Sequence, residues 1–584
     1  MLQKGGAFLL EGANPADVFT PEDFTDEHRM IADTCRDFIE KDVLPRIDDI
    51  EAQKEGLMRE LLLKAGELGI LSADIEEEYG GAELGKLGSI IITENISYGG
   101  SFALGHGAHT GIGSLPIVLF GNEEQKKKYL PKLATGEWIA AYALTEAGSG
   151  SDALAAKTKA VLTEDGKYYL LNGEKMFITN AGFADVYVTY AKIDGEKFTA
   201  FIVERDTPGF SLGAEEKKMG IKGSSTRSLI FEDARVPVEN VLGQIGKGHV
   251  IAFNILNIGR FKLGAGVTGS AKKAIELAVK YALQRQQFKT PIAKFGMIQT
   301  KLAQMNARTY ASESVQYRLA GLIEEALEGK KSGPEIGGAI EEYAIECSIS
   351  KVFGSEVLDY VADEMVQIYG GYGYIQEYPA ERFYRDSRIN RIFEGTNEVN
   401  RLIIPATLMR KAMKGELPFL QAAQGLQKEI MNLGAVIPAD DGKPLYTERA
   451  MLTLAKKMFL MISGQAAMKY MQKLAEEQEL IQVMADIAIE IYAMESCILR
   501  ALKAWEQDPA AAETKIDLTR AYIYDKWPVY EKLGREAMCY LESGDMLATQ
   551  LAIVKRMTRY VPINMIALRR KICAQMLEKE SYVC

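Results

Sequence analysis

Residues 142–155 read YALTEAGSGSDALA, and the pattern of the chain changes at this stretch. Before it, apolar residues recur at helical spacing, whereas after it short β-branched and aromatic runs alternate with turn residues such as EDG, NGE and TPG. The stretch itself is rich in small residues, which leave backbone N–H groups free to approach a phosphate or the edge of a ring. A flexible loop is the alternative interpretation.

Outward from this stretch, the chain divides into four regions of different character. Helical spacing fills residues 24–135, strand-like runs fill about 140–245, and helical spacing returns over about 247–412 and again from about 450 to the end. The sequence therefore predicts a mainly α chain with a central β domain. The expected domains are a helical domain at 1–139, a β domain at 140–246, a helical bundle at 247–412 and a helical extension at 413–584.

Composition and charge exclude several classes of protein. With 584 residues, 47% of them apolar and 26% charged, the chain is a multi-domain globular protein. A net charge of -11 argues against a nucleic-acid binder. The six cysteines show no CxxC spacing, so neither a disulfide scaffold nor a metal site is expected. The start does not read as a signal peptide, and no long uncharged apolar run predicts a membrane span, so a cytoplasmic location is expected.

One carboxylate lies in an informative setting in RIFEGTNEVNRLIIP, residues 391–405. Glu394 stands between Phe393 and Gly395, where partial desolvation would raise the pKa of its carboxyl and make it a better base near neutral pH. Local sequence alone favours the plainer interpretation, an exposed acid in a turn. The rest of the chain has to decide between the two.

Two further stretches carry patterns that suit a bound heterocycle. KMFITNAG, residues 175–182, places Phe177 and Thr179 on one side of a strand, although an ordinary half-buried strand would look the same. QIYGGYGYIQEYPAERFYRD, from residue 367, contains glycines that permit close backbone approach. The arginines that end this region at steps of three favour ion-paired structural roles over an anion site.

Together these stretches, in this order, resemble the acyl-CoA dehydrogenase family. ALTEAGSGSDALA and QIYGGYGYIQEYPAERFYRD match its two signatures, and the resemblance covers roughly residues 24–412. HTGIGSLPIVLFGNEEQKKKYLPKLATGE, KKMGIKG, NIGRF and the C-terminal extension are most similar to the very-long-chain branch. The family fold implied is an N-terminal helical domain, a middle β-barrel or sandwich and a C-terminal four-helix bundle, here with an extra helical domain.

The resemblance assigns a role to Glu394. It matches the family's catalytic base, which removes the C2 proton of an acyl-CoA thioester while the C3 hydride passes to FAD. Some branches carry this base on the helix equivalent to NILNIGRF, but the matching position here is Gly259 and offers no carboxylate. The resemblance also implies electron transfer to an electron-transfer flavoprotein and a role in fatty acid β-oxidation.

The family's binding residues carry over by position. Those matching FAD contacts within one subunit are Tyr142, Leu144, Thr145, Gly150, Ser151, Phe177, Ile178, Thr179, Thr396 and Glu398. Those matching contacts from a neighbouring subunit to the ADP half are Arg285, Phe288, Gln367, Gly370 and Gly371. Those matching the substrate side are Ser151, Asn257, Arg260, Phe393 and Gly395. Phe177, where many relatives have tryptophan, and Glu398, where an amide or aspartate is usual, depart from the pattern.

Chain-length preference can be argued from ALGHGAHTGIG, residues 103–113, on the segment that closes the acyl pocket in this family. Glycine inside a helix costs about 1 kcal/mol against alanine, so Gly105 and Gly107 should bring an offsetting benefit. Space for a long acyl tail is one such benefit, and close helix packing is the alternative.

The extension carries a Met-rich apolar stripe flanked by lysines. Its members are Met451, Leu454, Met458, Met461, Met468 and Met471. A basic amphipathic helix can lie on a membrane surface, but packing of the stripe against the core is the favoured interpretation. In the resembling branch this block covers the surface that pairs dimers elsewhere, which implies a homodimer. A scaffold protein of the same fold with little activity, and an acyl-CoA oxidase, are the alternative functions.

Overall fold

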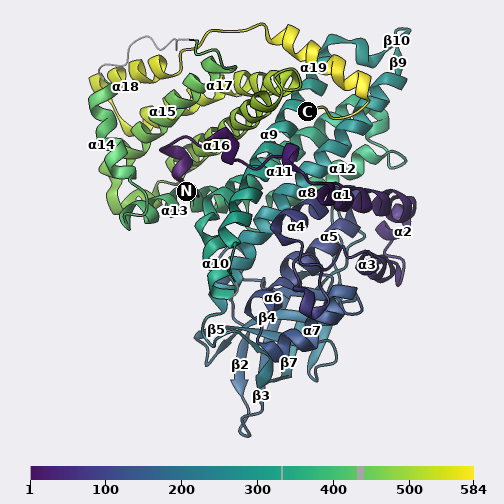
Figure 1. Ribbon diagram of the computed structural model, residues 1–584. Coiled ribbons are helices and arrows are strands. Elements are labelled where there is room, and N and C mark those ends of the chain that lie inside the picture. Colours follow the sequence, from purple (N-terminus) through teal and green to yellow (C-terminus); the bar gives the residue numbers. More distant parts are fainter. Residues whose placement is uncertain (1, 331–332, 431–439) are drawn as a thin grey trace.

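The computed structural model describes residues 2–330, 333–430 and 440–584 (Figure 1). The predicted fold class is confirmed: helices, a β domain, a helical bundle and an extra helical domain follow one another along the chain. In Figure 1 the β domain and the extension lie at opposite ends of the molecule, with the bundle between them.

The N-terminal domain is built from short helices whose ends follow local sequence. Thr25 caps the first long helix by accepting a hydrogen bond from the His28 backbone N–H, and Asn122 caps the last in the same way through Gln125. Gly136 then ends that last helix in the left-handed conformation. The helices are α1 (Asp26–Phe38), α2 (Ile47–Glu51), α3 (Leu57–Glu67), α4 (Gly85–Ile96), α5 (Ser101–Gly107), α6 (Leu115–Phe120) and α7 (Glu123–Thr135).

The middle domain is a mostly antiparallel sheet with strand order β6-β7-β3-β2-β4-β5-β8, and β1 pairs in parallel with β4. Its buried face holds apolar side chains from β3, β4, β5 and β7. The strands are β1 (Ala140–Ala143), β2 (Lys159–Leu162), β3 (Tyr168–Thr179), β4 (Val186–Ile193), β5 (Lys197–Glu204), β6 (Phe210–Glu215), β7 (Thr226–Pro237) and β8 (Val241–Leu242).

The bundle is organised around the 37-residue helix α8, which packs along α11, α9 and α4. By length and composition α8 is apolar enough to cross a membrane, but 72% of its apolar window is buried inside the protein, as expected of a core helix. The bundle elements are α8 (Gly248–Gln284), β9 (Gln286–Gln287), β10 (Thr290–Pro291), α9 (Gly296–Leu327), α10 (Gly333–Glu342), α11 (Ala344–Tyr369), α12 (Pro379–Ser387) and α13 (Asn397–Met413).

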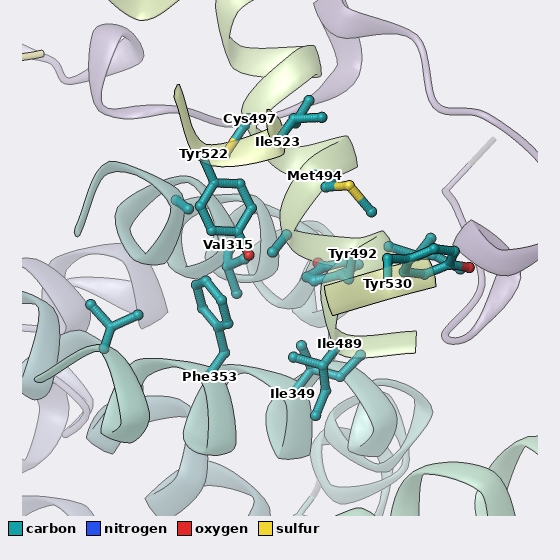
Figure 2. Close-up of a cluster of buried hydrophobic side chains, with 14 of the residues drawn as sticks. Val315, Ile349, Phe353, Ile489, Tyr492, Met494, Cys497, Tyr522, Ile523 and Tyr530 are labelled. Carbon is teal, nitrogen blue, oxygen red and sulfur yellow. The ribbon is translucent and has the colours of Figure 1, made fainter. Parts of the chain in front are cut away.

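The extension packs onto the bundle through α16 and α17, which lie against α9. Figure 2 shows the adjoining contact with α11: Phe353 of α11 faces Tyr522 of α17, with ring centroids 6.0 Å apart, and Ile349 of α11 lies near Ile489 of α16. The N-terminal residues also reach this region, since the rings of Phe8 and Tyr492 lie 4.7 Å apart. The helices are α14 (Phe419–Ile430), α15 (Tyr446–Tyr470), α16 (Gln478–Gln507), α17 (Glu513–Leu541), α18 (Gly544–Met557) and α19 (Met565–Lys579).

The Met-rich stripe lies on α15 and is mostly inside the protein. Its first four members, Met451, Leu454, Met458 and Met461, are buried. Met468 and Met471, where the helix ends, are exposed. These four residues pack inside the extension, because α15 lies against α14, α16, α17 and α18. Their burial gives no support to a membrane-facing stripe.

Candidate active site

Glu394 lies in a turn whose backbone has positive φ angles. Its φ is 57° and that of Gly395 is 80°, so two consecutive residues adopt the left-handed conformation just before α13. A non-glycine residue in this region is strained, and such strain is often found at functional sites. Thr396 then caps α13, because its hydroxyl accepts a hydrogen bond from the Val399 backbone N–H.

The Glu394 carboxylate is withdrawn from water. Its Oε2 atom is buried and accepts no hydrogen bond. Burial raises the pKa of Glu394 to about 7, although the positive charges of Arg260 and Lys351 oppose the rise. The exposed-turn interpretation of this acid is therefore wrong, and its properties suit a general base near neutral pH.

Two buried cations hold the Glu394 turn in place. Arg260 on α8 donates from Nε to the Glu394 carbonyl oxygen at 3.1 Å and from a terminal nitrogen to Asn257 Oδ1 at 2.9 Å. Lys351 on α11 donates from Nζ to the Gly395 carbonyl oxygen at 2.7 Å. Burial lowers the pKa of Lys351 to about 7, while the negative charge of Glu394 opposes the shift. Sequence reasoning missed Lys351, because nothing local to it marks a lysine that reaches across to a distant turn.

Gly259 has a steric reason to lack a side chain. A Cβ built at this position would lie 2.4 Å from Oε2 of Glu394. The two positions that could carry the family's base therefore share one space, and a side chain at 259 would clash with the carboxylate that is present. The observed position of the Glu394 side chain therefore requires glycine at position 259.

A large cavity of about 1060 Å³ opens beside Glu394. The structure brings most of the predicted site residues together around it, from the β domain and the bundle. Those in its lining are Tyr142, Leu144, Thr145, Gly150, Ser151, Phe177, Ile178, Thr179, Asn257, Arg260, Phe393, Glu394, Gly395 and Thr396. Basic residues that sequence reasoning did not single out also line it, namely Lys217, Lys218, His249 and Arg410; isolated cations carry no pattern that would reveal them.

A β-bulge directs Phe177 into this cavity. The pairing of β3 with β7 shifts between Lys175 and Ile178, and Phe177 has a φ of 59°. Bulges re-aim side chains in this way. As a result the Phe177 ring is 60% exposed at the cavity while its neighbour Ile178 is buried.

A second, narrower cavity of about 220 Å³ continues from Glu394 into the protein. Glu394, Phe393 and Thr179 line both cavities, so the carboxylate stands where the two meet. One wall of the narrow cavity, called here the acyl tunnel, is a face of α8 formed by Gly259, Lys262, Leu263, Gly266, Val267 and Ser270. The tunnel is lined mainly by apolar side chains and begins at Glu394.

The single charge on that face of α8 is turned away from the tunnel. The Nζ atom of Lys262 lies 2.7 Å from Oδ2 of Asp74, and Lys86 pairs with the other oxygen of the same carboxylate. A Cβ at Gly111 would lie 3.3 Å from Cδ of Lys262, so the apolar stem passes the tunnel-lining α5–α6 segment while the ammonium group is neutralised outside it.

The two glycines proposed for the acyl pocket occupy different surroundings. Gly107 lines the tunnel, and no atom lies within 4 Å of a Cβ built there. Gly105 lies outside the lining, where a Cβ would approach Asn180 at 3.3 Å and Met58 at 3.4 Å. Space for a ligand suits Gly107, and close packing suits Gly105.

Six predicted FAD contacts lie away from both cavities. Phe288 is 89% exposed on the β9–β10 hairpin, and the Arg285 guanidinium lies 5.3 Å from the centre of the Tyr372 ring. The end of α11 carries three more of these residues, all exposed: Gln367, Gly370 and Gly371. The sixth, Glu398, is exposed on α13. The first five lie on the surface of the bundle, outside the lining of the large cavity.

The large cavity fits a flat heterocycle with an attached phosphate chain. Phe177 offers an uncovered aromatic ring, and a Cβ at Gly148 or Gly150 would meet no atom within 4 Å, so backbone there is open to a ligand. Glu394 lines the same space, and its Oε2 atom has no hydrogen-bond partner. These features fit FAD beside Glu394.

Comparison with known proteins gives consistent matches over the whole chain. Models of the acyl-CoA dehydrogenase N-terminal, middle and C-terminal domains match residues 25–137, 141–234 and 246–409, and a further acyl-CoA dehydrogenase C-terminal domain matches 454–556. A probable acyl-CoA dehydrogenase of Bacillus subtilis is 56% identical over 100% of this chain and 98% of its own length. The human mitochondrial very long-chain specific acyl-CoA dehydrogenase is 38% identical over 82% of this chain and 74% of its own.

Solved structures agree with the sequence matches. The crystal structure of an acyl-CoA dehydrogenase complexed with FAD from Bacillus anthracis is 56% identical, covers 100% of both chains and superposes with a TM-score of 0.98. Butyryl-CoA dehydrogenase from Megasphaera elsdenii is 38% identical, with a TM-score of 0.61 over 66% of this chain and 99% of its own.

Proposed function

The chain belongs to the acyl-CoA dehydrogenase family and is an FAD-dependent enzyme, and from this premise we propose that its substrates are long-chain fatty acyl-CoA thioesters. It would convert them to trans-2-enoyl-CoA in fatty acid β-oxidation and pass the electrons to an electron-transfer flavoprotein. The observation that carries the proposal is a buried carboxylate, Glu394, at the mouth of a long apolar tunnel.

In the proposed reaction Glu394 removes a proton from C2 of the thioester. Its burial keeps the carboxylate basic enough for this step, and Arg260 and Lys351 hold the turn so that the oxygen stays in position. When bound, FAD supplies the acceptor for the C3 hydride, and the C2=C3 double bond forms from the remaining electrons. The backbone N–H of Glu394 would polarise the thioester carbonyl.

The length of the tunnel supports a long acyl chain. Gly259 lies against the base, and Ser270 is the last α8 residue in the tunnel wall. Eleven helical residues advance about 16 Å at about 1.5 Å each. An extended chain advances about 1.25 Å per methylene, as C–C bonds of about 1.5 Å at near-tetrahedral angles require, so about 13 carbons beyond C3 fit along this wall. That corresponds to an acyl chain of about sixteen carbons.

A homodimer is part of the proposal. Arg285, Phe288, Gln367, Gly370 and Gly371 are remote from the cavity in their own subunit, and they match family contacts to the ADP half of FAD on a neighbour. The exposed ring of Phe288 favours such a partner over a solvated hairpin. A second copy of the chain would then complete each cofactor site.

The test is anaerobic reduction of the purified protein by palmitoyl-CoA. Bleaching of the flavin absorbance, with enoyl-CoA as product, is the expected result, and absence of bleaching by any saturated acyl-CoA would refute the function. Reoxidation by an electron-transfer flavoprotein but only slowly by oxygen would separate a dehydrogenase from an oxidase. A folded, flavin-loaded protein that no acyl-CoA reduces would instead fit a scaffold protein.

A further inference from the structure

One side chain of the acyl tunnel also lines a second cavity. Tyr98, in the short helical turn Ser97–Gly99 between α4 and α5, lines the tunnel near Ser270. The same tyrosine lines a separate cavity of about 440 Å³ on the other side. Among the residues that the structure describes, Tyr98 alone belongs to both linings, so it stands between the two spaces.

The space behind Tyr98 differs in chemistry from the tunnel. This polar chamber is lined by charged side chains that pair with one another: Lys272 with Glu94 and Glu313, and Lys273 with Glu40 at 3.3 Å. The C-terminal residues Ser581 and Tyr582 also line it. Entry into such a chamber would not stabilise an apolar acyl tail, whereas polar groups can form hydrogen bonds there.

The ring and the hydroxyl of Tyr98 have separate surroundings. The Nζ atom of Lys273 lies 5.2 Å from the centre of the ring and helps to fix its position. The hydroxyl oxygen is buried and has no hydrogen-bond partner. The charges of Glu40, Arg36 and Glu276, which line the chamber, act on the pKa of this hydroxyl. Tyr98 thus borders the tunnel on one side and is surrounded by charged groups of the chamber on the other.

We propose that Tyr98 is the end wall of the acyl tunnel and the residue that sets the longest acyl chain the enzyme accepts. The inference rests on the proposed function, since it concerns the same tunnel. A chain of about sixteen carbons ends at this ring by the helix arithmetic above. Four more methylenes would need about 5 Å, which the ring occupies, so longer chains must displace Tyr98 or bind incompletely.

The test is Tyr98→Ala, with Tyr98→Phe as the matched control. Alanine removes the partition, so the ratio of kcat/KM for C20 to that for C16 should rise about tenfold or more. Phenylalanine keeps the ring and should leave this ratio at the wild-type value. A 16-hydroxy C16 substrate should also gain relative to plain C16 in the alanine variant alone, because its hydroxyl would reach the polar chamber.

The outcomes separate this inference from the proposed function. Turnover of C16 by the wild type tests the function, and the change in the C20 to C16 ratio tests the wall. An unchanged ratio in Tyr98→Ala, with flavin content and unfolding temperature preserved, would overturn the assignment. A rise of equal size in Tyr98→Phe would overturn it as well, because the ring would then not be the barrier. If alanine perturbs folding, Tyr98→Leu gives a smaller side chain that keeps the position apolar, and the same ratio is measured.

Discussion

Replacing Gly266 on α8 by leucine should shorten the acyl tunnel at a known depth. Gly266 lies seven residues beyond Gly259, so the new side chain would enter the tunnel about 10 Å from the base. About eight methylenes beyond C3 fit before that point. A C8 chain ends short of the block, whereas a C16 chain loses the burial of about five methylenes, or at most about 4 kcal/mol.

The expected result is a fall of up to about a thousandfold in kcat/KM for C16 with little change for C8. The leucine should be tolerated, because a Cβ at 266 meets Thr93 at 3.7 Å, an ordinary contact, and leucine is a better helix former than glycine. Gly338→Leu on α10, at an exposed glycine with open space, is the matched control. Equal losses on C8 and C16 would refute the reasoning, because the chain would then not run along α8.

The other predictions concern the base, the cofactor and stability. Glu394→Gln should retain FAD while the rate of flavin reduction falls about 10²–10⁴-fold; wild-type bleaching in stopped flow would remove this residue as the base. Burial raises the pKa of Glu394 to about 7, so kcat/KM should decrease as the pH is lowered through about 7. Because the charge of Lys351 opposes this rise in pKa, Lys351→Met should move the decrease in kcat/KM to higher pH. Arg285→Glu should lower the flavin-to-protein ratio after gel filtration if a partner's cofactor lies there. Burial raises the pKa of Glu346 to about 7, so ionising this carboxyl destabilises the fold once the pH rises above the pKa that it has in the unfolded chain. Glu346→Gln should therefore raise the free energy of unfolding, measured in urea, by up to about 3 kcal/mol at pH 8 but not near pH 4.

The order of helical and strand regions could be read from the sequence because periodicity is a local property. The period of two after residue 155 and the helical spacing around it sufficed for the fold class. Glu394 could be singled out because its neighbours Phe393 and Gly395 are adjacent in sequence. Its burial could not, since that depends on α8 and α11, which are distant along the chain.

Long-range features of the site had no local signal. The clash that excludes a side chain at Gly259 exists only because α8 meets the Glu394 turn. Tyr98 closes the tunnel only because the turn after α4 packs beside α8. The predicted role of the surface residues around Arg285 likewise comes from the family resemblance alone. The structure adds that these residues lie outside the lining of the large cavity in the same subunit.

The extension supports the active site without lining it. Both cavities are lined by residues between 93 and 410, all within the described part of the chain. However, Asp486 on α16 lies 2.7 Å from Arg401 on α13, and Arg401 also pairs with Glu356 on α11 at 2.8 Å. Glu356 in turn accepts a hydrogen bond at 3.1 Å from Asn397, the first residue of α13 after the Glu394 turn. These charged and polar contacts connect the extension to α13, the helix that follows the Glu394 turn. Loosening α16 should therefore disorder that turn before it disturbs the rest of the cavity.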